Sequence, residues 1–295
     1  MGIKKSIIVL FGKPNVGKST LFNALQKKDF AITSKKPQTT RVNSYTIIDL
    51  DKNKQIALID TPGFHLPNNK LDKFLNQQIN KAFKCATNAY FIFDNTRHFD
   101  KEDEIVLKNM QNFNINKKVL IINKIDKKSK LSPEDEIVLK QYHFDHIIYL
   151  SALNNNNIDE LIQLMKDSCD NEDLDLTIFK EPGDEFISQE IIRLSCINIL
   201  EKELPYAIGV NLNQFSYNKE KNLLEIDAEI FVEKESQKPI VIGKQGVMIK
   251  KIGIDARKKL LEIFDCKINL KLFVKVQKDW RNNEYIINSL GYKNT

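Results

Sequence analysis

The sequence of 295 residues predicts an α/β fold with a doubly wound sheet in its first half and a smaller α+β domain in its second half. The first prediction rests on strand-like and helix-like segments that alternate along the first half. The second rests on a change of pattern near residue 184, after which the order becomes helix, two strands, two helices and a strand. A chain of this length is expected to form about two domains, each with its own core.

The alternating segments of the first half can be placed by their apolar patterns. Apolar runs predict strands at 6–11, 43–50, 55–60, 89–94, 118–123 and 147–151. Helical periodicity predicts helices near 18–28, 70–86, 102–113, 133–141 and 158–168. Such alternation predicts helices on both faces of the sheet. Open α/β sheets bind ligands at the carboxyl ends of their strands, so polar motifs that follow these strands are the candidate site.

The first motif is residues 12–19, GKPNVGKS, between a predicted strand and a predicted helix. In the pattern G-x-x-x-x-G-K-S, backbone N–H groups and a helix N-terminus can surround phosphate groups. Lys18 would reach the β- and γ-phosphates, and the hydroxyl of Ser19 would hold Mg²⁺. The alternative is a Gly/Lys turn at the end of a strand. The strand, loop and helix together favour a P-loop NTPase domain.

Two further segments would complete the phosphate and metal site. Asp60 ends the third predicted strand in the sequence Asp-Thr-Pro-Gly and could reach Mg²⁺ through water, while the N–H of Gly63 could contact the γ-phosphate. The polar loop 34–41 could supply a hydroxyl to Mg²⁺ only when the γ-phosphate is present. Thr40 is favoured over Thr39 because it lies closer to the second strand. The alternatives are an ordinary turn and a basic solvated loop.

Residues 123–126, Asn-Lys-Ile-Asp, follow a buried strand and predict which base is bound. The carboxylate of Asp126 can accept from both N1–H and N2–H₂ of guanine, whereas adenine offers no such pair of donors. Asn123 can bond the other edge of the base, and the stem of Lys124 can cover its ring. The N–H of Ala152, at the end of the last strand, could donate to guanine O6. The nucleotide is therefore predicted to be GTP.

The predicted site residues fall into three groups. The nucleotide-binding residues are Gly12, Lys13, Pro14, Asn15, Val16, Gly17, Lys18, Ser19, Asp60, Thr61, Pro62, Gly63, Phe64, Asn123, Lys124, Ile125, Asp126, Ser151 and Ala152. The catalytic residues are Lys18, Thr40, Gly63 and Asn15. The Mg²⁺ residues are Ser19, Thr40 and, through water, Asp60.

Composition excludes several other classes of protein. The hydrophobic content of 42% and the charged content of 28% are those of a soluble globular protein. The first strand follows MGIKK directly and no apolar run approaches the length of a membrane span, so neither a signal peptide nor a transmembrane helix is expected. The four cysteines form no C-x-x-C pair and are expected to be reduced thiols of a cytoplasmic protein.

The second half has the pattern of an RNA-binding domain. Residues 1–170 are predicted to form the nucleotide domain, 171–183 an acidic linker, and 184–295 the second domain. In the second domain a helix is predicted at 184–203, strands at 207–215, 222–232 and 267–276, and two helices around a G-x-x-G loop. The order α-β-β-α-α-β matches a KH domain of type II topology, whose G-x-x-G loop clamps the backbone of single-stranded RNA. The predicted RNA-binding residues are Gly243, Lys244, Gln245, Gly246, Lys250 and Lys251.

Charge supports the prediction of RNA binding. Residues 238–278 contain eleven Lys/Arg against three acids, a net charge of +8, whereas the whole chain carries +6. A single segment therefore holds the entire basic surplus, as expected for a surface that neutralises phosphates. The alternatives are a solvated lysine-rich helix face and a basic helix on a membrane surface.

Taken together, the motifs resemble those of the bacterial Era family of GTPases over essentially the whole chain. The segments that carry the resemblance are GKPNVGKST, KPQTTR, DTPGFH, NKID, SAL, EFISQEIIR, ELPYAIGV and QKPIVIGKQGVMIKKIGIDAR. The resemblance implies a GTPase that assists assembly of the small (30S) ribosomal subunit by binding the 3′ end of 16S rRNA. It also implies peripheral association with the inner membrane, and a monomer is expected. Residues 194–199 depart from the family by lacking charged side chains, although their apolar periodicity is kept.

The expected hydrolysis has no evident side-chain base. Phe64 follows Asp-Thr-Pro-Gly, where Ras-type enzymes keep a Gln that orients water, and a phenyl ring cannot do so. Hydrolysis would then rest on positioning and on charge neutralisation by Lys18, Mg²⁺ and loop amides. In GTPases with this P-N-V-G-K-S form, the Asn can bind K⁺ beside the phosphates. For Asn15, K⁺ binding and a simple capping role both remain open.

Three functions therefore compete. The first is a GTP-timed RNA assembly factor whose hydrolysis resets binding. The second is an RNA-binding module whose nucleotide domain no longer hydrolyses GTP, and the third is a membrane-associated signalling GTPase. Intact Lys18, Ser19, Thr40 and Asp60 weigh against the second, and the G-x-x-G loop weighs against the third.

Overall fold

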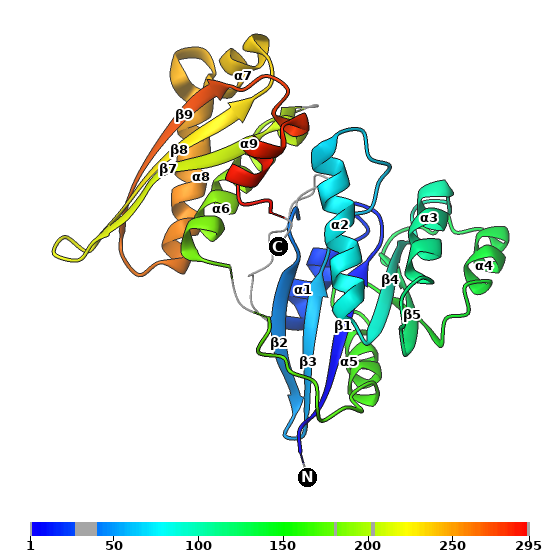
Figure 1. Cartoon of the computed structure of the whole chain (residues 1–295). Helices are drawn as coiled ribbons and strands as arrows, with labels where there is room; N and C mark the ends of the chain where they lie inside the picture. Colours follow the sequence, from blue (N-terminus) through cyan, green and yellow to red (C-terminus); the bar gives the residue numbers. More distant parts are fainter. Residues whose placement is uncertain (1, 27–39, 180–181, 202–203, 294–295) are drawn as a thin grey trace. The chain divides into compact units, whose positions relative to one another are not determined.

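The computed structural model of the chain describes residues 2–26, 40–179, 182–201 and 204–293. These residues divide into two compact units, and the second is formed mainly by the chain from Pro182 onward (Figure 1). Each unit has its own sheet and its own hydrophobic core. Within the described part of the chain, no helix combines the length and apolar character needed to cross a membrane.

The first unit is built on a six-stranded sheet with the order β2-β3-β1-β4-β5-β6. Only β2 runs antiparallel to its neighbour β3; the other described pairs are parallel. The strands are β1 (Lys4–Phe11), β2 (Ser44–Asp51), β3 (Lys54–Asp60), β4 (Asn88–Asp94), β5 (Lys117–Asn123) and β6 (His146–Leu150). The helices are α1 (Lys18–Gln26), α2 (Lys70–Cys85), α3 (Lys101–Met110), α4 (Pro133–Lys140) and α5 (Ile158–Asp167). The predicted doubly wound sheet is confirmed.

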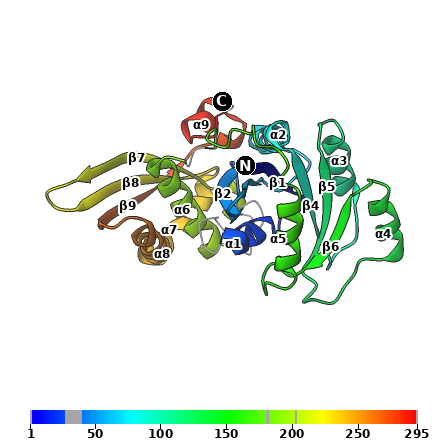
Figure 2. The same ribbon diagram turned by 90° about the horizontal axis from the view of Figure 1, so that it is seen from below.

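The helices cover both faces of this sheet (Figure 2). One core packs α2, α3 and α4 against the sheet, and the other packs α1 and α5 against its opposite face. Strand β1 is central, so its run Ile7–Phe11 is buried on both sides, which explains why this strand is continuously apolar. Strand β2 lies at the edge and alternates between more and less exposed residues.

Helix α3 begins at a well-defined N-terminus, which matters for the site. The side chain of Asp100 accepts from the backbone N–H groups of Glu102 and Asp103, and the side chain of Asp103 accepts from the N–H of Asp100. This is a capping box, and it satisfies amide groups that the first turn would otherwise leave unpaired. Asp103 is fully buried and also holds the guanidinium of Arg97. The start of α3 is therefore a rigid platform for its acidic side chains.

The second unit has the predicted order α-β-β-α-α-β. Helix α6 (Asp184–Ile199) is followed by β7 (Gly209–Asn218), β8 (Leu223–Val232), α7 (Lys238–Ile242), α8 (Val247–Ile263) and β9 (Lys267–Val276). Strand β8 is central, antiparallel to β7 and parallel to β9. Short 3₁₀ turns lie at Leu204–Ala207, Glu235–Gln237, Lys244–Gly246 and Trp280–Asn282. The α+β KH topology predicted from the sequence is confirmed.

Two details of this unit differ from the sequence-based expectation. The helix expected at 184–203 ends at Ile199, and Leu200 already has extended backbone. In addition, the chain after β9 folds back as the turn Trp280–Asn282 and helix α9 (Glu284–Ser289). Trp280 is fully buried, and its indole N–H donates to the carbonyl of Ala207 at 2.9 Å.

Candidate nucleotide-binding and RNA-binding sites

The loop between β1 and α1 has the backbone of a phosphate-binding loop. Gly12, Asn15 and Gly17 all have positive φ, at 144°, 63° and 101°. A Cβ on Gly17 would lie 2.2 Å from Nδ2 of Asn123, so only glycine permits this close approach between the loop and the base-reading motif. Gly63 also lies close to the loop, since a Cβ on it would be 2.6 Å from the backbone N of Pro14. The structure thus brings three separate sequence motifs together.

Lys18 lies in the floor of this loop. Its ammonium donates to the carbonyl of Gly12 at 3.2 Å and to the carbonyl of Lys13 at 2.8 Å. The residue is only 5% exposed, and burial lowers the pKa of its ammonium to about 8, partly offset by Asp60. A phosphate oxygen would supply the counter-charge that this buried cation needs.

Ser19, Thr40 and Asp60 converge as the sequence predicted for a metal site. Oδ2 of Asp60 accepts from the hydroxyl of Ser19 at 2.6 Å and from that of Thr40 at 3.3 Å, and the two hydroxyls are 3.1 Å apart. The other oxygen, Oδ1, is buried without a hydrogen-bond partner among the described residues. Burial raises the pKa of Asp60 to about 6, against the lowering effects of Lys18 and the two hydroxyls.

This donor set fits Mg²⁺. A hard, oxygen-binding cation prefers carboxylate and hydroxyl oxygens and keeps several waters, which matches one carboxylate and two hydroxyls. The unpaired Oδ1 of Asp60 gives such a water a ready acceptor. Of the loop 34–41 expected to supply a hydroxyl, residues 34–39, including Thr39, lie outside the described residues.

Asn123 ties the base-reading motif to the phosphate loop. Its Nδ2 donates to the carbonyl of Val16 at 2.8 Å, while its Oδ1 accepts from the N–H groups of Lys124 and Ala152 at 2.8 and 3.0 Å. The N–H of Ala152, expected to donate to guanine, is thus engaged with Asn123 here. Lys124 is held at its tip, because its ammonium contacts the carbonyl of Asn15 and Oδ2 of Asp94, each at 2.6 Å.

Asp126 lies beside the end of β6. Its Oδ1 accepts from the hydroxyl of Ser151 at 2.5 Å, and the N–H of Ile125 donates to the carbonyl of Leu150. Ser151 therefore orients the carboxylate that would read guanine. The motif of β5 and the motif of β6 form one wall, as expected from the parallel order of these neighbouring strands.

Two predicted nucleotide-site residues direct their side chains away from the site, and a third is exposed. Phe64 is 7% exposed and packs in the core under α2 and α3, and its N–H donates to the carbonyl of Gly12. The side chain of Lys13 forms ion pairs with Asp100 and Glu102. Asn15 is exposed, and its side chain makes no hydrogen bond to the described residues. Phe64 is therefore unable to orient water, and Lys13 can contribute to the site only through its backbone.

The G-x-x-G loop joins α7 to α8. Gly243 has φ of 75°, and a Cβ there would lie 2.7 Å from the backbone N of Met248, so the tight turn requires glycine. Gln245 and Gly246 also have positive φ, at 53° and 77°. The N–H of Gly246 donates to the carbonyl of Gly243, which closes the turn. The side chains of Lys244 and Gln245 are exposed.

The structure also separates the basic residues of this unit into two sets. On β9, Lys271 and Lys275 pair with Asp227 and Glu229 of β8 at 3.6 and 3.2 Å. By contrast, five exposed cations near the G-x-x-G loop and along α8 form no ion pair with the described residues: Lys244, Lys250, Lys251, Arg257 and Lys258. Exposed cations without an ion pair to the described residues therefore lie at the loop and along α8.

Two residues that support the site were not predicted from the sequence. Asp94 ends β4 at the ligand edge of the sheet, and its carboxylate holds Lys124 and the N–H and hydroxyl of Thr96. Its position at a strand end was the available signal. Glu102 contacts Lys13 although it lies 89 residues further along the chain, in helix α3. No local sequence pattern predicts that contact.

Fold and site together define a P-loop GTP-binding protein with a KH domain. The model of the 50S ribosome-binding GTPase family matches residues 7–124, and that of the KH domain matches residues 203–281. The chain is 42% identical to the GTPase Era of Ureaplasma parvum serovar 3 over 98% of both chains, and 38% identical to that of Caldicellulosiruptor saccharolyticus over 99% of this chain and 98% of the relative. The chain belongs to the family of the GTPase Era, and it is a GTP hydrolase.

Two solved structures agree over almost the whole chain. One is a single-residue variant of Aquifex aeolicus Era bound to GDP·AlF₄⁻, with 30% identity, a TM-score of 0.88 and coverage of 98% of this chain and 99% of that one. The other is Era in complex with MgGDPNP and nucleotides 1506–1542 of 16S ribosomal RNA, with 30% identity, a TM-score of 0.89 and the same coverage. The resemblance to the Era family that the sequence motifs indicated is thereby confirmed.

Proposed function

We propose that this protein binds the 3′ end of 16S rRNA through its KH unit and assists assembly of the 30S subunit, with GTP hydrolysis switching the bound state. The observation that carries the proposal is the G-x-x-G loop, which has the tight glycine turn and exposes Lys244 and Gln245 beside unpaired cations of α8. In KH domains such a loop clamps the backbone of single-stranded nucleotides. The full-length similarity to an Era bound to nucleotides 1506–1542 of 16S rRNA supports the choice of RNA.

The nucleotide site would hold two cations and the γ-phosphate. Mg²⁺ would be held by Ser19, Thr40 and Asp60, whose oxygens converge within 3.3 Å of one another, and it would neutralise charge that develops on the phosphates. The MgGDPNP of the related Era structure supports this metal. Lys18 and the N–H of Gly63 would contact the γ-phosphate. K⁺ beside Asn15 is the second cation that we propose.

The switch follows from which contacts depend on the γ-phosphate. Thr40 and Gly63 would bind Mg²⁺ and the γ-phosphate only in the GTP state, so their segments would be held before hydrolysis and released after it. Phe64 is buried in the core and cannot orient the attacking water. Hydrolysis would therefore depend on positioning and on charge neutralisation. We propose a cytoplasmic location, shared with the ribosome, and peripheral membrane contact remains a prediction.

A charge-matched pair of variants tests the RNA interface. Lys244→Asp with Gln245→Asp changes the charge by −3 at the G-x-x-G loop and keeps both glycines. Lys219→Asp with Lys221→Gln makes the same change at the exposed turn between β7 and β8, at the other end of the sheet (Figure 1). Only the first pair should lower affinity for a single-stranded 3′-terminal segment of 16S rRNA, by at least about tenfold, because carboxylates would meet the RNA phosphates.

Binding is measured by fluorescence anisotropy against the cognate RNA and a scrambled RNA, with GTP binding measured in parallel. GTP binding should be unchanged in both variants. If the loop variant binds the cognate RNA as tightly as the parent, the KH loop is not the recognition site. Retained binding to anionic lipid vesicles would then favour the membrane alternative for the basic surface.

A further inference from the structure

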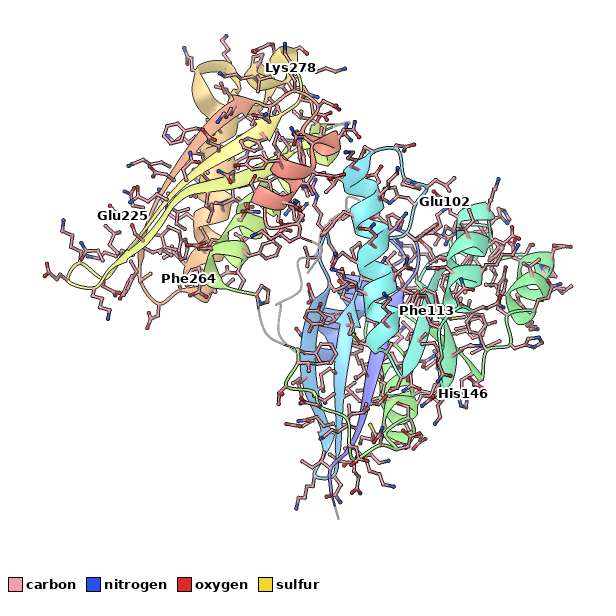
Figure 3. The ribbon with its side chains drawn as sticks, viewed as in Figure 1. Glu102, Phe113, His146, Glu225, Phe264 and Lys278 are labelled. Atoms are coloured by element: carbon pink, nitrogen blue, oxygen red, sulfur yellow. The ribbon has the colours of Figure 1, made fainter. Side chains whose placement is uncertain are left out.

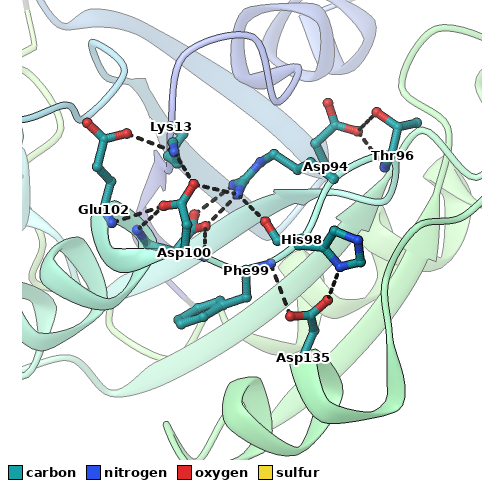
Figure 4. A network of polar contacts seen from close by, with 10 residues as sticks. Lys13, Asp94, Thr96, His98, Phe99, Asp100, Glu102 and Asp135 are labelled. Carbon is teal, nitrogen blue, oxygen red and sulfur yellow. Dashed lines mark hydrogen bonds and ion pairs between the residues drawn. The ribbon is translucent and has the colours of Figure 1, made fainter.

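A cluster of charged groups lies between the phosphate loop and the first turn of α3 (Figure 4). The ammonium of Lys13 contacts Oδ2 of Asp100 at 2.5 Å and Oε2 of Glu102 at 2.7 Å. Lys13 is only 16% exposed, and its own carbonyl accepts from Lys18. The side chain of a phosphate-loop residue is thus held by two carboxylates from a separate helix.

Glu102 makes a second contact with its other oxygen. Oε1 accepts from the backbone N–H of Leu66 at 3.0 Å. Leu66 lies three residues after Gly63, and its side chain is exposed, so this hydrogen bond, rather than packing of the side chain, anchors its backbone. One carboxylate therefore holds the phosphate loop on one oxygen and the segment after Gly63 on the other.

The charge and rigidity of Glu102 suit this bridging role. Partial burial raises the pKa of its carboxyl, but the hydrogen bonds from Lys13 and from the N–H of Leu66 outweigh it and leave the pKa below its ordinary value. The side chain is therefore ionised at neutral pH. The helix that carries it is fixed by the capping box of Asp100 and by the pair between Arg97 and the fully buried Asp103.

We propose that Glu102 is a positioning residue for GTP hydrolysis, which sets the backbone from Gly63 to Leu66 against the phosphate loop. The reason is that the reaction lacks a water-orienting side chain, so the placement of backbone amides near the γ-phosphate carries more of the rate. The near end of this segment is fixed by the bond from the N–H of Phe64 to the carbonyl of Gly12. At the far end, Nδ2 of Asn76 donates to the carbonyl of His65 at 3.0 Å, and Glu102 holds the N–H of Leu66 and connects this end to the phosphate loop through Lys13.

The proposal distinguishes hydrolysis from nucleotide binding. Loss of Glu102 leaves Lys13 paired with Asp100, so the loop that surrounds the α- and β-phosphates keeps its anchor. The segment after Gly63, by contrast, loses the hydrogen bond that holds its backbone at Leu66. Hydrolysis should therefore fall while affinity for GDP is kept.

The test compares Glu102→Ala with Glu104→Gln in the full chain. Glu104 lies in the same turn of α3 but pairs only with the exposed Lys108 among the described residues, so it controls for a change of charge on this helix. We expect Glu102→Ala to lower the single-turnover rate of GTP hydrolysis about tenfold, the effect of one lost charged hydrogen bond, with GDP affinity changed by less than about threefold. Glu104→Gln should match the parent in both measurements.

Two variants of Lys13 test whether Glu102 acts by linking the phosphate loop to the segment after Gly63. Lys13→Met should lower the rate as Glu102→Ala does, and Lys13→Arg should hydrolyse GTP faster than Lys13→Met, because arginine keeps a cation for both carboxylates. Parent-like hydrolysis by Glu102→Ala would overturn the proposal. So would an equal loss of rate and of GDP affinity, or a comparable loss in Glu104→Gln, because each would indicate a general structural or charge effect.

Discussion

Asp60 is a buried carboxylate whose hydrogen bonds and pKa reflect its place in the predicted metal site. It lies under the phosphate loop with one oxygen bonded to Ser19 and Thr40 and the other without a partner among the described residues. Burial is the largest influence on its pKa and raises it to about 6. In the absence of metal, the ionised form is therefore a cost to the folded state, as expected for a group adapted to bind a cation.

This cost predicts that the contribution of Asp60 to the stability of the metal-free protein falls as the pH rises, whereas a carboxyl with a lowered pKa would have the opposite effect. Because the folded-state pKa of Asp60 lies above its unfolded value of about 3.9, the native state binds the proton more tightly, and this group destabilises the metal-free protein above pH 6. At pH 7.5, the free energy of unfolding of Asp60→Asn should therefore be higher than that of the parent by ~1–2 kcal/mol. The difference should shrink as the pH falls from 6 to 4.

Urea unfolding in the presence of EDTA measures this difference. With Mg²⁺ and GDP the order should reverse, because only the carboxylate of the parent gains from the bound cation. A stability difference that is constant across this pH range would contradict the raised pKa of Asp60. A variant that still gains full stability from Mg²⁺ would remove Asp60 from the metal site.

At the scale of elements, the segment after β9 is part of the KH core. Trp280 is fully buried and bonded to Ala207, and the hydroxyl of Tyr292 donates to the buried Glu190 of α6 at 2.8 Å. Glu190 also holds Arg193 of the same helix, so a charged pair beneath the surface is completed by the last described turn. The side chains of this unit are drawn in Figure 3, where the labelled Phe264 and Lys278 lie before and after β9 in the chain.

This packing predicts a large effect of one substitution. Trp280→Ala should destabilise the second unit by about 3–5 kcal/mol, because it removes a large buried ring and leaves the carbonyl of Ala207 without its donor. Tyr285→Ala, on the neighbouring helix α9, is the matched control, since Tyr285 is 83% exposed. Its effect should stay within about 0.5 kcal/mol.

Chemical denaturation followed by far-UV circular dichroism measures both variants. The transition of the second unit should move to lower denaturant concentration in Trp280→Ala while the first unit keeps its own transition, because the two units have separate cores. Equal midpoints for Trp280→Ala and Tyr285→Ala would show that the segment is not part of the core.

At the scale of the whole molecule, the two units join GTP hydrolysis to a KH fold on one chain. Without a water-orienting side chain, basal hydrolysis should be slow, on the order of 10⁻⁴ to 10⁻² s⁻¹, as in small GTPases that lack an activator. It should be faster in K⁺ than in Na⁺, because a cation near Asn15 would neutralise charge on the phosphates. It should be faster still with the cognate RNA.

Phosphate release in KCl and in NaCl at equal ionic strength tests the role of the cation. Asn15→Ala should lose the stimulation by K⁺ while keeping the rate in Na⁺. If this variant keeps full stimulation, the exposed amide of Asn15 does not bind K⁺, and the capping role remains. The assignment as a GTPase does not depend on this outcome.

Local patterns in the sequence were enough to predict the two folds and to name candidate residues for the chemistry. Glycine spacing, strand ends and apolar periodicity are local signals, and they placed Lys18, Asp60 and Asp126 at one edge of a parallel sheet, where the structure has them. The α-β-β-α-α-β order and the G-x-x-G turn could likewise be predicted from the sequence, because both depend on short-range backbone preferences. Even the inability of Phe64 to orient water followed from its side-chain chemistry.

The tertiary structure alone decided how these parts hold one another. The bond between Asn123 and Val16, the pairs of Lys13 with α3, and the burial of Trp280 against Ala207 join residues more than 70 positions apart. Single-sequence periodicity carries no information about such partners, since an exposed and a paired Lys or Glu look alike. They are set by which helix end or loop the packed sheet brings within a few ångströms, and the anchoring of the segment after Gly63 by Glu102 is one result.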